Sequence, residues 1–236
     1  MKIRGERECR SCGTEWSYYE TGAITCPECG SVQSVGLDER TEHTDAPVSL
    51  DLTSVRNRVD EDTIEDVAAA ATERCREYTR KRGFIDGGSL RPLDDTYVAA
   101  AELRHVAKAI EREMRPGDAA KAYFFELLAG ADTGDRPAVE AVPETLQQPY
   151  ALAITAAVDA YQRDVRRYLD DNPEPEARTL SGRIRDHRKR IEALDGDVDP
   201  ADAHRLRRAA GDLGTFLNGE ESAAITADNW LSGLEG

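Results

Sequence analysis

Long apolar runs are missing from this chain of 236 residues. No stretch approaches the roughly 18 apolar residues that a membrane-spanning helix requires, so we expect no contact with a membrane interior. Residues 1–8 are charged and lack the apolar stretch of a secretory signal peptide. We therefore expect a cytoplasmic protein.

The sequence motifs of several large enzyme classes are missing as well. We find no glycine-rich phosphate loop, no Gly-x-Ser-x-Gly nucleophile motif and no His-Glu-x-x-His zinc-protease motif. The four histidines are scattered along the chain and define no catalytic triad. We predict a non-catalytic protein and assign no catalytic residues.

Lysine is scarce, although the chain is highly charged. Asp and Glu number 46 against 31 basic residues, only 5 of which are Lys, and the net charge is −15. Such surfaces suit molar salt, where the Debye length falls to about 3 Å and repulsion between carboxylates is screened. We predict a halophilic protein, with an ordinary acidic protein as the alternative. In a salt-rich cytoplasm the negative charge does not exclude nucleic-acid binding.

Cysteine is rare but concentrated. Four of the five cysteines form two Cys-x-x-Cys-Gly motifs, Cys9 to Gly13 and Cys26 to Gly30, with 13 residues between Cys12 and Cys26. In each motif a tight turn brings two sulfurs to one ion, and the glycine after it adopts a conformation that other residues resist. Four thiolates in a tetrahedron suit zinc. We predict one Zn²⁺ per chain, bound by Cys9, Cys12, Cys26 and Cys29.

The segment between the motifs predicts a small β module. Residues 15–20 are aromatic and alternating, which indicates a strand; Thr21-Gly22 is the expected turn, 23–25 the returning strand and 31–35 a third strand. A module of 36 residues buries too little apolar surface to fold alone, so the metal must stabilise it. Cys75 lies on an apolar helical stripe, and we expect it to be a buried thiol.

Residues 9–30 resemble the zinc ribbons of archaeal transcription proteins, including the transcription factor IIB type, and the half Cys26-Pro-Glu-Cys29-Gly30 is typical of that class. The gap between the motifs is short for it. The whole chain, with its segment 16–22 and acidic helical remainder, is similar to an uncharacterised haloarchaeal zinc-ribbon family. This resemblance implies a zinc ribbon and a salt-adapted cytoplasm, but no known activity. The remainder does not resemble the cyclin-type repeats of transcription factor IIB.

The motif spacing also resembles rubredoxin-like modules, which hold iron and carry electrons. Because such modules occur beside helical di-iron bundles, Glu102 and His105 need consideration as half of a carboxylate di-iron site. A second Glu-x-x-His motif is missing. Iron in the ribbon stays the alternative to zinc, and an ordinary helix surface is the alternative for Glu102 and His105.

Aromatics make up only 6% of the chain, which favours helices packed through small side chains over a sheet core. Apolar residues spaced three and four apart predict helices at about 62–82, 94–115, 119–129 and 149–169. Within 176–218, two further helices with a 4-3 spacing predict an antiparallel hairpin. The fold class is thus a small N-terminal β zinc ribbon plus an all-α domain ending in an antiparallel helical hairpin.

This pattern divides the chain into five parts. They are a zinc ribbon (1–36), a linker (37–60), a helical body (61–170), an arginine-rich antiparallel helical hairpin (176–218) and a C-terminal tail (219–236).

Basic residues cluster in three places, and such clusters can follow the phosphates of a nucleic acid. We predict a nucleic-acid contact from Arg10, Trp16, Tyr18, Arg183, Arg185, Arg188, Lys189 and Arg190. A further cluster lies within 74–82. The alternative is that acids elsewhere balance these charges, and that the aromatics cover the core of the ribbon.

The leading functional prediction is a zinc-binding, non-catalytic module that contacts DNA, RNA or a transcription-related protein. The alternative is a structural or adaptor protein that self-associates or binds a protein partner through its helical hairpin, with zinc as a fold staple. A third alternative is a rubredoxin-like electron carrier.

Overall fold

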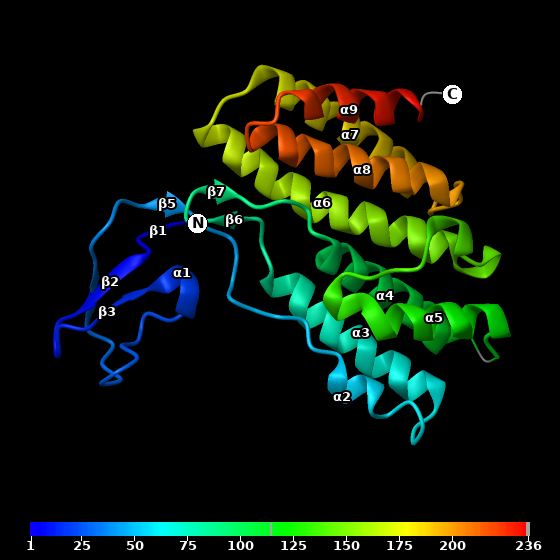
Figure 1. Cartoon of the computed structure of the whole chain (residues 1–236), viewed down its shortest axis with the longest axis horizontal. Coiled ribbons are helices and arrows are strands. Elements are labelled where there is room, and N and C mark those ends of the chain that lie inside the picture. Colours follow the sequence, from blue (N-terminus) through cyan, green and yellow to red (C-terminus); the bar gives the residue numbers. More distant parts are fainter. Residues whose placement is uncertain (114, 235–236) are drawn as a thin grey trace.

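The computed structural model describes residues 1–113 and 115–234. Figure 1 shows a small β module at one end of the molecule, built from the N-terminal residues, and a stack of helices built from the remainder. This arrangement confirms the predicted fold class of a small β ribbon followed by a mostly helical domain.

The ribbon is a three-stranded antiparallel sheet. In spatial order its strands are β3 (Glu15–Ser17), β2 (Glu6–Cys9) and β4 (Ser34–Gly36). In the register of the sheet, Arg7 of β2 lies opposite Trp16 on one side and Gly36 on the other. A second pair, β1 (Lys2–Ile3) and β5 (Thr41–Glu42), leads from the ribbon towards the helices.

The predicted strand at 15–20 is wrong in its second half, where the chain forms the helical turn α1 (Tyr18–Thr21). The Tyr18 amide still donates to the carbonyl of Gly5 (2.8 Å), and the chain turns directly after this last hydrogen bond to the residues before β2. Gly22 then closes the turn in a left-handed conformation, with φ 64°. Residues 23–25, predicted as the returning strand, form no strand.

Residues 37–60, predicted as a linker, are better ordered than that description implies. They contain β5 and the short helix α2 (Thr53–Arg56), whose Arg56 is ion-paired with Asp132 at 2.7 Å. The apolar side chains of this segment that are buried in the helical core are Leu50, Leu52 and Val55. This stretch therefore contributes to the helical core, and the division of the chain into domains stays a prediction.

The longer helices are α3 (Ile64–Lys81), α4 (Asp95–Arg112), α5 (Asp118–Gly130), α6 (Gln147–Asp171), α7 (Pro175–Ala193), α8 (Pro200–Leu217) and α9 (Ser222–Ser232). Side chains cap four of their starts. The capping side chains and the amides that donate to them are Thr63 and Asp66, Asp94 and Tyr97, Glu174 and Glu176, and Asp199 and Ala201. Met114, part of the predicted helix at 94–115, lies outside the described residues. No helix in the described part of the chain has the length and apolar character that a membrane crossing requires.

Short elements connect these helices. They are the hairpin β6 (Ile85–Asp86) and β7 (Ser89–Leu90) and the 3₁₀ turns η1 (Ala131–Thr133), η2 (Val139–Ala141) and η3 (Glu144–Leu146). The core beside the hairpin is aromatic: the ring of Phe84 makes edge contacts with Tyr97 (centroids 4.7 Å apart) and Tyr161 (4.9 Å apart). Phe84 thereby anchors the start of the hairpin between α4 and α6.

The predicted helical hairpin exists as α7 and α8, but it is not the end of the fold. The predicted tail contains α9, which packs on α8; there the indole nitrogen of Trp230 donates to Asp212 at 2.9 Å. The seam residues Ile184, Leu206 and Leu213 are fully buried, because α6 and α9 cover the hairpin as well. The apolar seam is therefore part of the core of this chain. Residues 235–236 of the predicted tail lie outside the described part.

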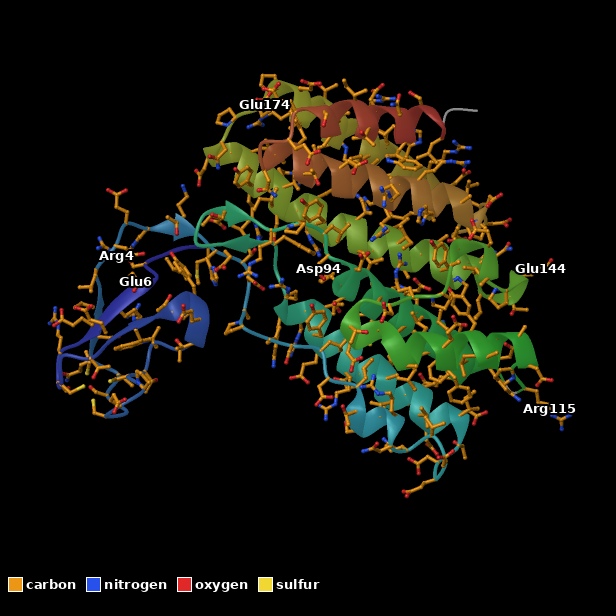
Figure 2. All side chains as sticks on the ribbon, in the orientation of Figure 1. Arg4, Glu6, Asp94, Arg115, Glu144 and Glu174 are labelled. Carbon is orange, nitrogen blue, oxygen red and sulfur yellow. The ribbon has the colours of Figure 1, made fainter. Side chains whose placement is uncertain are left out.

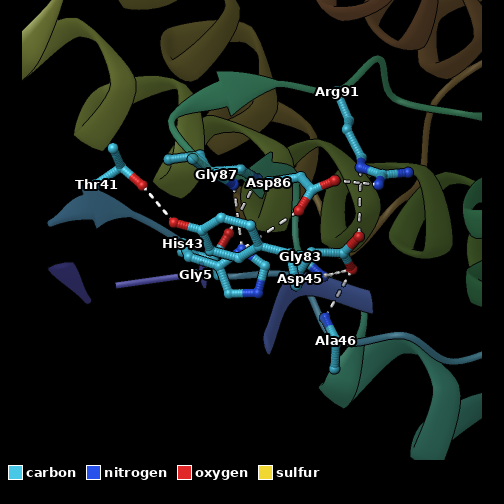
Figure 3. Close-up of polar contacts among 12 residues, drawn as sticks. Gly5, Thr41, His43, Asp45, Ala46, Gly83, Asp86, Gly87 and Arg91 are labelled. Carbon is cyan, nitrogen blue, oxygen red and sulfur yellow. Dashed lines mark hydrogen bonds and ion pairs between the residues drawn. The ribbon is translucent and has the colours of Figure 1, made fainter. Parts of the chain in front are cut away.

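The ribbon contacts the helical body through a junction formed by β5, the residues after it and the β6–β7 hairpin (Figure 3). The Thr44 amide donates to the carbonyl of Ile85 (2.9 Å), and the Gly88 amide donates to that of Glu42 (2.9 Å). His43 is buried here, and the ring of Tyr19 from the ribbon lies over it, with centroids 4.7 Å apart. The ribbon is thus positioned by contacts on both sides of His43.

Candidate metal centre

The two Cys-x-x-Cys-Gly motifs form the same backbone turn twice. In the first, the Cys9 amide donates to Thr14 and the Gly13 amide donates back to Cys9, both at 2.9 Å. In the second, the Cys26 amide donates to Ser31 at 2.9 Å and the Gly30 amide to Cys26 at 3.0 Å. The two glycines have φ values of 75° and 71°. A side chain at either position would be strained, which explains the glycine in each motif.

The turns bring the four predicted ligands together. The sulfurs of Cys9, Cys12, Cys26 and Cys29 all lie within 4.8 Å of one another. Across the two turns, the Sγ atoms of Cys9 and Cys29 are 3.6 Å apart, and so are those of Cys12 and Cys26. Four sulfurs at about 2.3 Å from a central Zn²⁺ would stand about 3.8 Å apart in a regular tetrahedron. The cluster therefore fits one tetrahedral metal ion.

One side of the cluster is covered and the other faces solvent. Cys9 and Cys26 are buried, whereas Cys12 and Cys29 are exposed. Trp16 covers the buried pair: its side chain is 7% exposed, it forms a small core with both cysteines, and its indole nitrogen donates to the Ala23 carbonyl at 3.0 Å. Figure 2 shows the sulfur atoms at the tip of the ribbon, far from the helices.

Local electrostatics favour thiolates at part of the cluster. Burial opposes ionisation of Cys9, but amide hydrogen bonds from Ser11 and Cys12 outweigh it and lower the pKa of the Cys9 thiol to about 6. Hydrogen bonds from Thr14 lower the pKa of Cys12. At Cys29 the Ser31 amide lowers the pKa, but the neighbouring sulfurs outweigh it and raise the value to about 12. A bound cation would offset the repulsion between neighbouring thiolates, because it stabilises every thiolate around it.

Hydroxyl groups at matching positions support the two turns, and the sequence analysis did not assign them a role. Thr14 and Ser31 each follow the second cysteine of their motif by two residues. The hydroxyl of Thr14 lies 3.2 Å from the Cys12 sulfur, and that of Ser31 lies 3.0 Å from the Ser11 hydroxyl of the other turn. The sequence signal for the matching positions of these two hydroxyl groups is the repeated triplet, Cys-Gly-Thr in the first turn and Cys-Gly-Ser in the second.

A family model with the description "Family of unknown function (DUF7117)" matches residues 1–231. The chain belongs to this family. No curated protein and no solved structure matches it. The match spans the ribbon and the helices together, so the metal cluster and the helical body are parts of one family unit. It agrees with the predicted membership of an uncharacterised family, whereas a haloarchaeal source and a likeness to transcription factor IIB stay predictions.

Among the residues described for this family member, the four cysteines are the one group of three or more Cys, His, Asp or Glu side chains placed to hold a metal ion. The cluster could hold zinc or iron, since both accept four thiolates in a tetrahedron. Cys75 lies apart from it within the helical core, and burial raises the pKa of its thiol to about 12. Cys75 is thus the buried thiol that its helical stripe predicted.

The di-iron alternative for Glu102 and His105 is wrong. Glu102 is fully buried, accepts from the hydroxyl of Tyr123 and pairs with Arg136 at 2.7 Å. Burial raises the pKa of Glu102, and Arg136 opposes that rise. His105 faces elsewhere, with its Nδ1 donating to the Ala101 carbonyl at 2.8 Å. Each side chain has a structural partner of its own, and no second carboxylate joins them among the described residues.

Two of the three ribbon residues predicted to contact nucleic acid face inward. Trp16 belongs to the ribbon core, and the half-buried ring of Tyr18 makes an edge contact with His43, with centroids 6.0 Å apart. Both rings thus pack within the chain, and their contact with nucleic acid stays a prediction. Arg10 is exposed at the first turn, where its amide donates to Gln33 at 2.9 Å.

The predicted basic cluster on α7 is divided by the fold. Arg188 pairs with Asp159 of α6 at 3.1 Å and with Glu192 at 2.6 Å, Arg183 pairs with Asp228 of α9, and Arg190 donates to the Leu234 carbonyl at 2.9 Å. These three arginines thus connect α7 to its neighbours. Arg185 and Lys189 are exposed, and Arg185 lies 3.6 Å from the carboxylate of Asp186.

Proposed function

We propose that this protein is a non-catalytic zinc-binding protein, with one Zn²⁺ per chain held by Cys9, Cys12, Cys26 and Cys29. The observation that carries the proposal is the set of four sulfurs within 4.8 Å of one another. Catalytic zinc sites keep one position open for water or substrate, whereas four thiolates complete the coordination of the ion. The role of the metal is then to stabilise the ribbon.

The preference for zinc over iron can be tested by elemental analysis of the full-length protein, purified with both metals present. Zinc has a filled d shell and gives a colourless site, whereas an iron–thiolate site absorbs visible light. One equivalent of zinc and no visible absorption supports the proposal. One equivalent of iron with visible absorption that bleaches on reduction supports the electron-carrier alternative instead.

We further propose that the ribbon contacts nucleic acid or a complex that processes it. The support is positional: the sulfur atoms of the ribbon lie at the end away from the helices (Figure 2), and Arg10 of the first cysteine turn is exposed. A rigid turn that carries an arginine is suited to a phosphate group, two of whose oxygens accept parallel hydrogen bonds from a guanidinium group.

Binding of labelled double-stranded DNA and single-stranded RNA tests this contact, in about 2 M KCl to suppress non-specific phosphate attraction. The variants are Arg10→Glu and the double substitution Cys26→Ser, Cys29→Ser. Arg40→Glu is the matched control, because Arg40 is exposed on the ribbon outside the cysteine turns. Saturable binding that both test variants lose and the control keeps supports the contact. Equal binding by all four proteins contradicts it.

A protein partner is the second candidate, and the exposed apolar side chains of the ribbon favour it. Ile24 is 53% exposed and Val32 is 72% exposed, and both flank Ser34, which hydrogen-bonds to the carbonyls of both residues. Exposed apolar side chains that lie together mark protein contacts more often than nucleic-acid contacts. We therefore propose the ribbon as the adaptor surface in place of the helical hairpin, whose apolar seam is buried within the chain. A solution mass above 26.0 kDa that Ile24→Ser with Val32→Ser reduces would support it.

A further inference from the structure

A groove on the helical body carries an unusual density of positive charge. It lies over α4, between α3 and α6, and encloses about 350 Å³. Its arginines are Arg76 and Arg80 of α3, Arg104 of α4 and Arg163 of α6, and we call it the arginine groove. The three helices are neighbours in the stack (Figure 1), so residues far apart in sequence meet here.

The positive charge of the arginine groove is poorly compensated. In residues 1–113 and 115–234, the side chains of Arg80 and Arg104 have no hydrogen-bond or ion-pair partner, although Arg104 is half-buried. The lining contains one carboxylate, Asp159, which already lies 3.1 Å from Arg188 and 3.6 Å from Arg163. In a chain of net charge −15, two unpaired arginines in one groove indicate a site for an anion.

The fourth arginine adds to this charge. Arg76 pairs with Glu73 at 3.5 Å, but both side chains are largely exposed, and such pairs contribute little. Its guanidinium group is therefore free to turn towards a ligand at small cost.

The uncharged lining of the groove consists of four alanines, which we call the alanine floor, together with Thr79, Tyr97 and His105. Its alanines are Ala101 of α4 and Ala156, Ala157 and Ala160 of α6. Small side chains allow a flat group to approach the helices closely. A bare inorganic anion would make no favourable contact with such an apolar surface. Arginines beside an apolar floor fit a ligand with phosphate at one end and a flat apolar group at the other. The volume of the groove is at the lower end of the range for small-molecule sites.

We propose that the arginine groove binds a nucleotide unit, with its phosphate groups held by Arg80 and Arg104 and its base lying on the alanine floor. The unit can be a free nucleotide or one nucleotide of a single strand, because the two present the same groups. The site lies on α3, α4 and α6, away from the metal cluster, so the proposal goes beyond the function proposed for the ribbon and does not depend on it.

The test uses the full-length, zinc-loaded protein and three probes. They are fluorescently labelled adenosine diphosphate, unlabelled pyrophosphate as its competitor, and a labelled oligouridylate of about 10 nucleotides, the length that a single-strand site commonly covers. We expect Arg80→Gln and Arg104→Gln each to weaken binding about tenfold, as expected for loss of a hydrogen bond between charged groups. Arg74→Gln is the matched control, since it removes the same charge from an exposed position of α3 outside the groove.

A second variant changes the floor without changing the charge. Ala156 is exposed in the groove, so Ala156→Leu fills the floor without overpacking the core, and circular dichroism verifies the fold. We expect this variant to bind the labelled diphosphate more weakly than wild type does. Pyrophosphate, which lacks a base, should compete only weakly for the groove in both wild type and Ala156→Leu. Binding that Arg74→Gln weakens as much as Arg104→Gln, or wild-type protein that binds none of the probes, overturns the proposal.

A free nucleotide and a nucleotide within a single strand give different results in this test. Tight binding of the diphosphate identifies a free nucleotide, whereas binding of the oligouridylate alone, with affinity that falls steeply with salt, identifies a strand. The variant Cys26→Ser, Cys29→Ser separates this site from the ribbon. Groove binding that survives in this variant supports the inference even if the ribbon contacts nothing. Binding that depends on the cysteines and not on Arg80 or Arg104 overturns the inference and leaves the ribbon proposal standing.

Discussion

The ribbon and the helical body are stabilised in different ways. The buried cluster of the ribbon has three members, Trp16 and the two cysteines Cys9 and Cys26. The core of the body extends from Leu50 to Leu234 and joins all the long helices. A chain segment can thus adopt a defined structure with almost no apolar core, provided that a metal ion supplies the missing free energy.

The junction between these regions is of a third kind. It consists of backbone hydrogen bonds, the ring contact between His43 and Tyr19, and a buried carboxylate, Asp164 of α6. Asp164 accepts from the Thr44 hydroxyl at 2.6 Å and from the Phe84 amide at 2.8 Å. The ribbon is thus connected to the body mainly through polar contacts, which can be weakened without damage to either core.

Removal of the metal ligands gives the largest expected effect. Structural zinc contributes about 10–16 kcal/mol to the folding of small ribbons, so Cys26→Ser with Cys29→Ser should unfold the ribbon. The body should stay folded, since its core does not include the cluster. Fluorescence of Trp16, recorded in a Trp230→Phe background, should shift to the red, while helical circular dichroism stays near the wild-type value.

The control for this prediction is Cys75→Ala, which removes a cysteine outside the cluster and should leave zinc content at one equivalent. A ribbon that keeps Trp16 protected after its ligands are removed would show that the comparison is wrong and that packing on the body stabilises it.

A cavity in the body tests the other side of the comparison. Leu103 of α4 is fully buried, and Leu103→Ala should lower the free energy of unfolding by about 2–5 kcal/mol. Zinc content should not change. Leu194→Ala is the control, because Leu194 is 46% exposed and its truncation should cost less than about 0.5 kcal/mol. Denaturation in urea measures both. Loss of zinc from the Leu103→Ala variant would instead show that the stability of the ribbon depends on that of the body.

The same comparison explains which features were predictable from the sequence. The long helices were, because apolar residues such as Val67, Ala71 and Cys75 repeat at helical spacing and are buried together. The metal ligands were predictable because the constraint is local: two sulfurs per turn, with glycine after each turn. Each of these two sequence patterns is formed by residues that are only a few positions apart in the chain.

What was missed depends on contacts between distant residues. Leu52 has no periodic neighbours, yet it is buried because Asp132, far along the chain, accepts from its amide and pairs with Arg56. The basic cluster at 74–82 illustrates the same limit: Arg82 pairs with Asp45, whereas Arg80 faces the arginine groove. Sequence proximity cannot separate these outcomes, since the partner of each arginine lies on another element.

The junction offers the next smaller effect. Asp164→Ala removes the carboxylate that accepts from Thr44, Phe84 and Arg167. Buried donors that lose an acceptor cost about 1–3 kcal/mol, so we expect a loss of that size. Hydrogen exchange of the Phe84 amide should accelerate.

Asp170→Ala is the control for this variant, since Asp170 lies on the same helix with its side chain 69% exposed. It should be neutral within about 0.5 kcal/mol. If both variants lose the same stability, net charge rather than the buried acceptor would be responsible.

The smallest expected effect is a dependence on pH through His43. Burial lowers the pKa of His43, and the carboxylates of Asp86 and Asp45 oppose that change without reversing it. The Gly87 amide donates to Nδ1 at 3.3 Å, so this nitrogen is unprotonated in the fold (Figure 3). Because the unfolded chain then binds the proton more readily, the stabilisation is complete above the unfolded pKa of about 6.5 and is lost as pH falls below it.

His43→Asn isolates this contribution, because asparagine offers the Gly87 amide an acceptor that does not titrate near neutral pH. Burial also lowers the pKa of His105 and of His204, and acid protonates the zinc ligands, but these groups act in both proteins. The free energy of unfolding should therefore fall more steeply for wild type than for the variant as pH is lowered through about 6.5. Parallel curves would show that His43 acts through its ring packing with Tyr19 alone, and that the junction does not respond to pH.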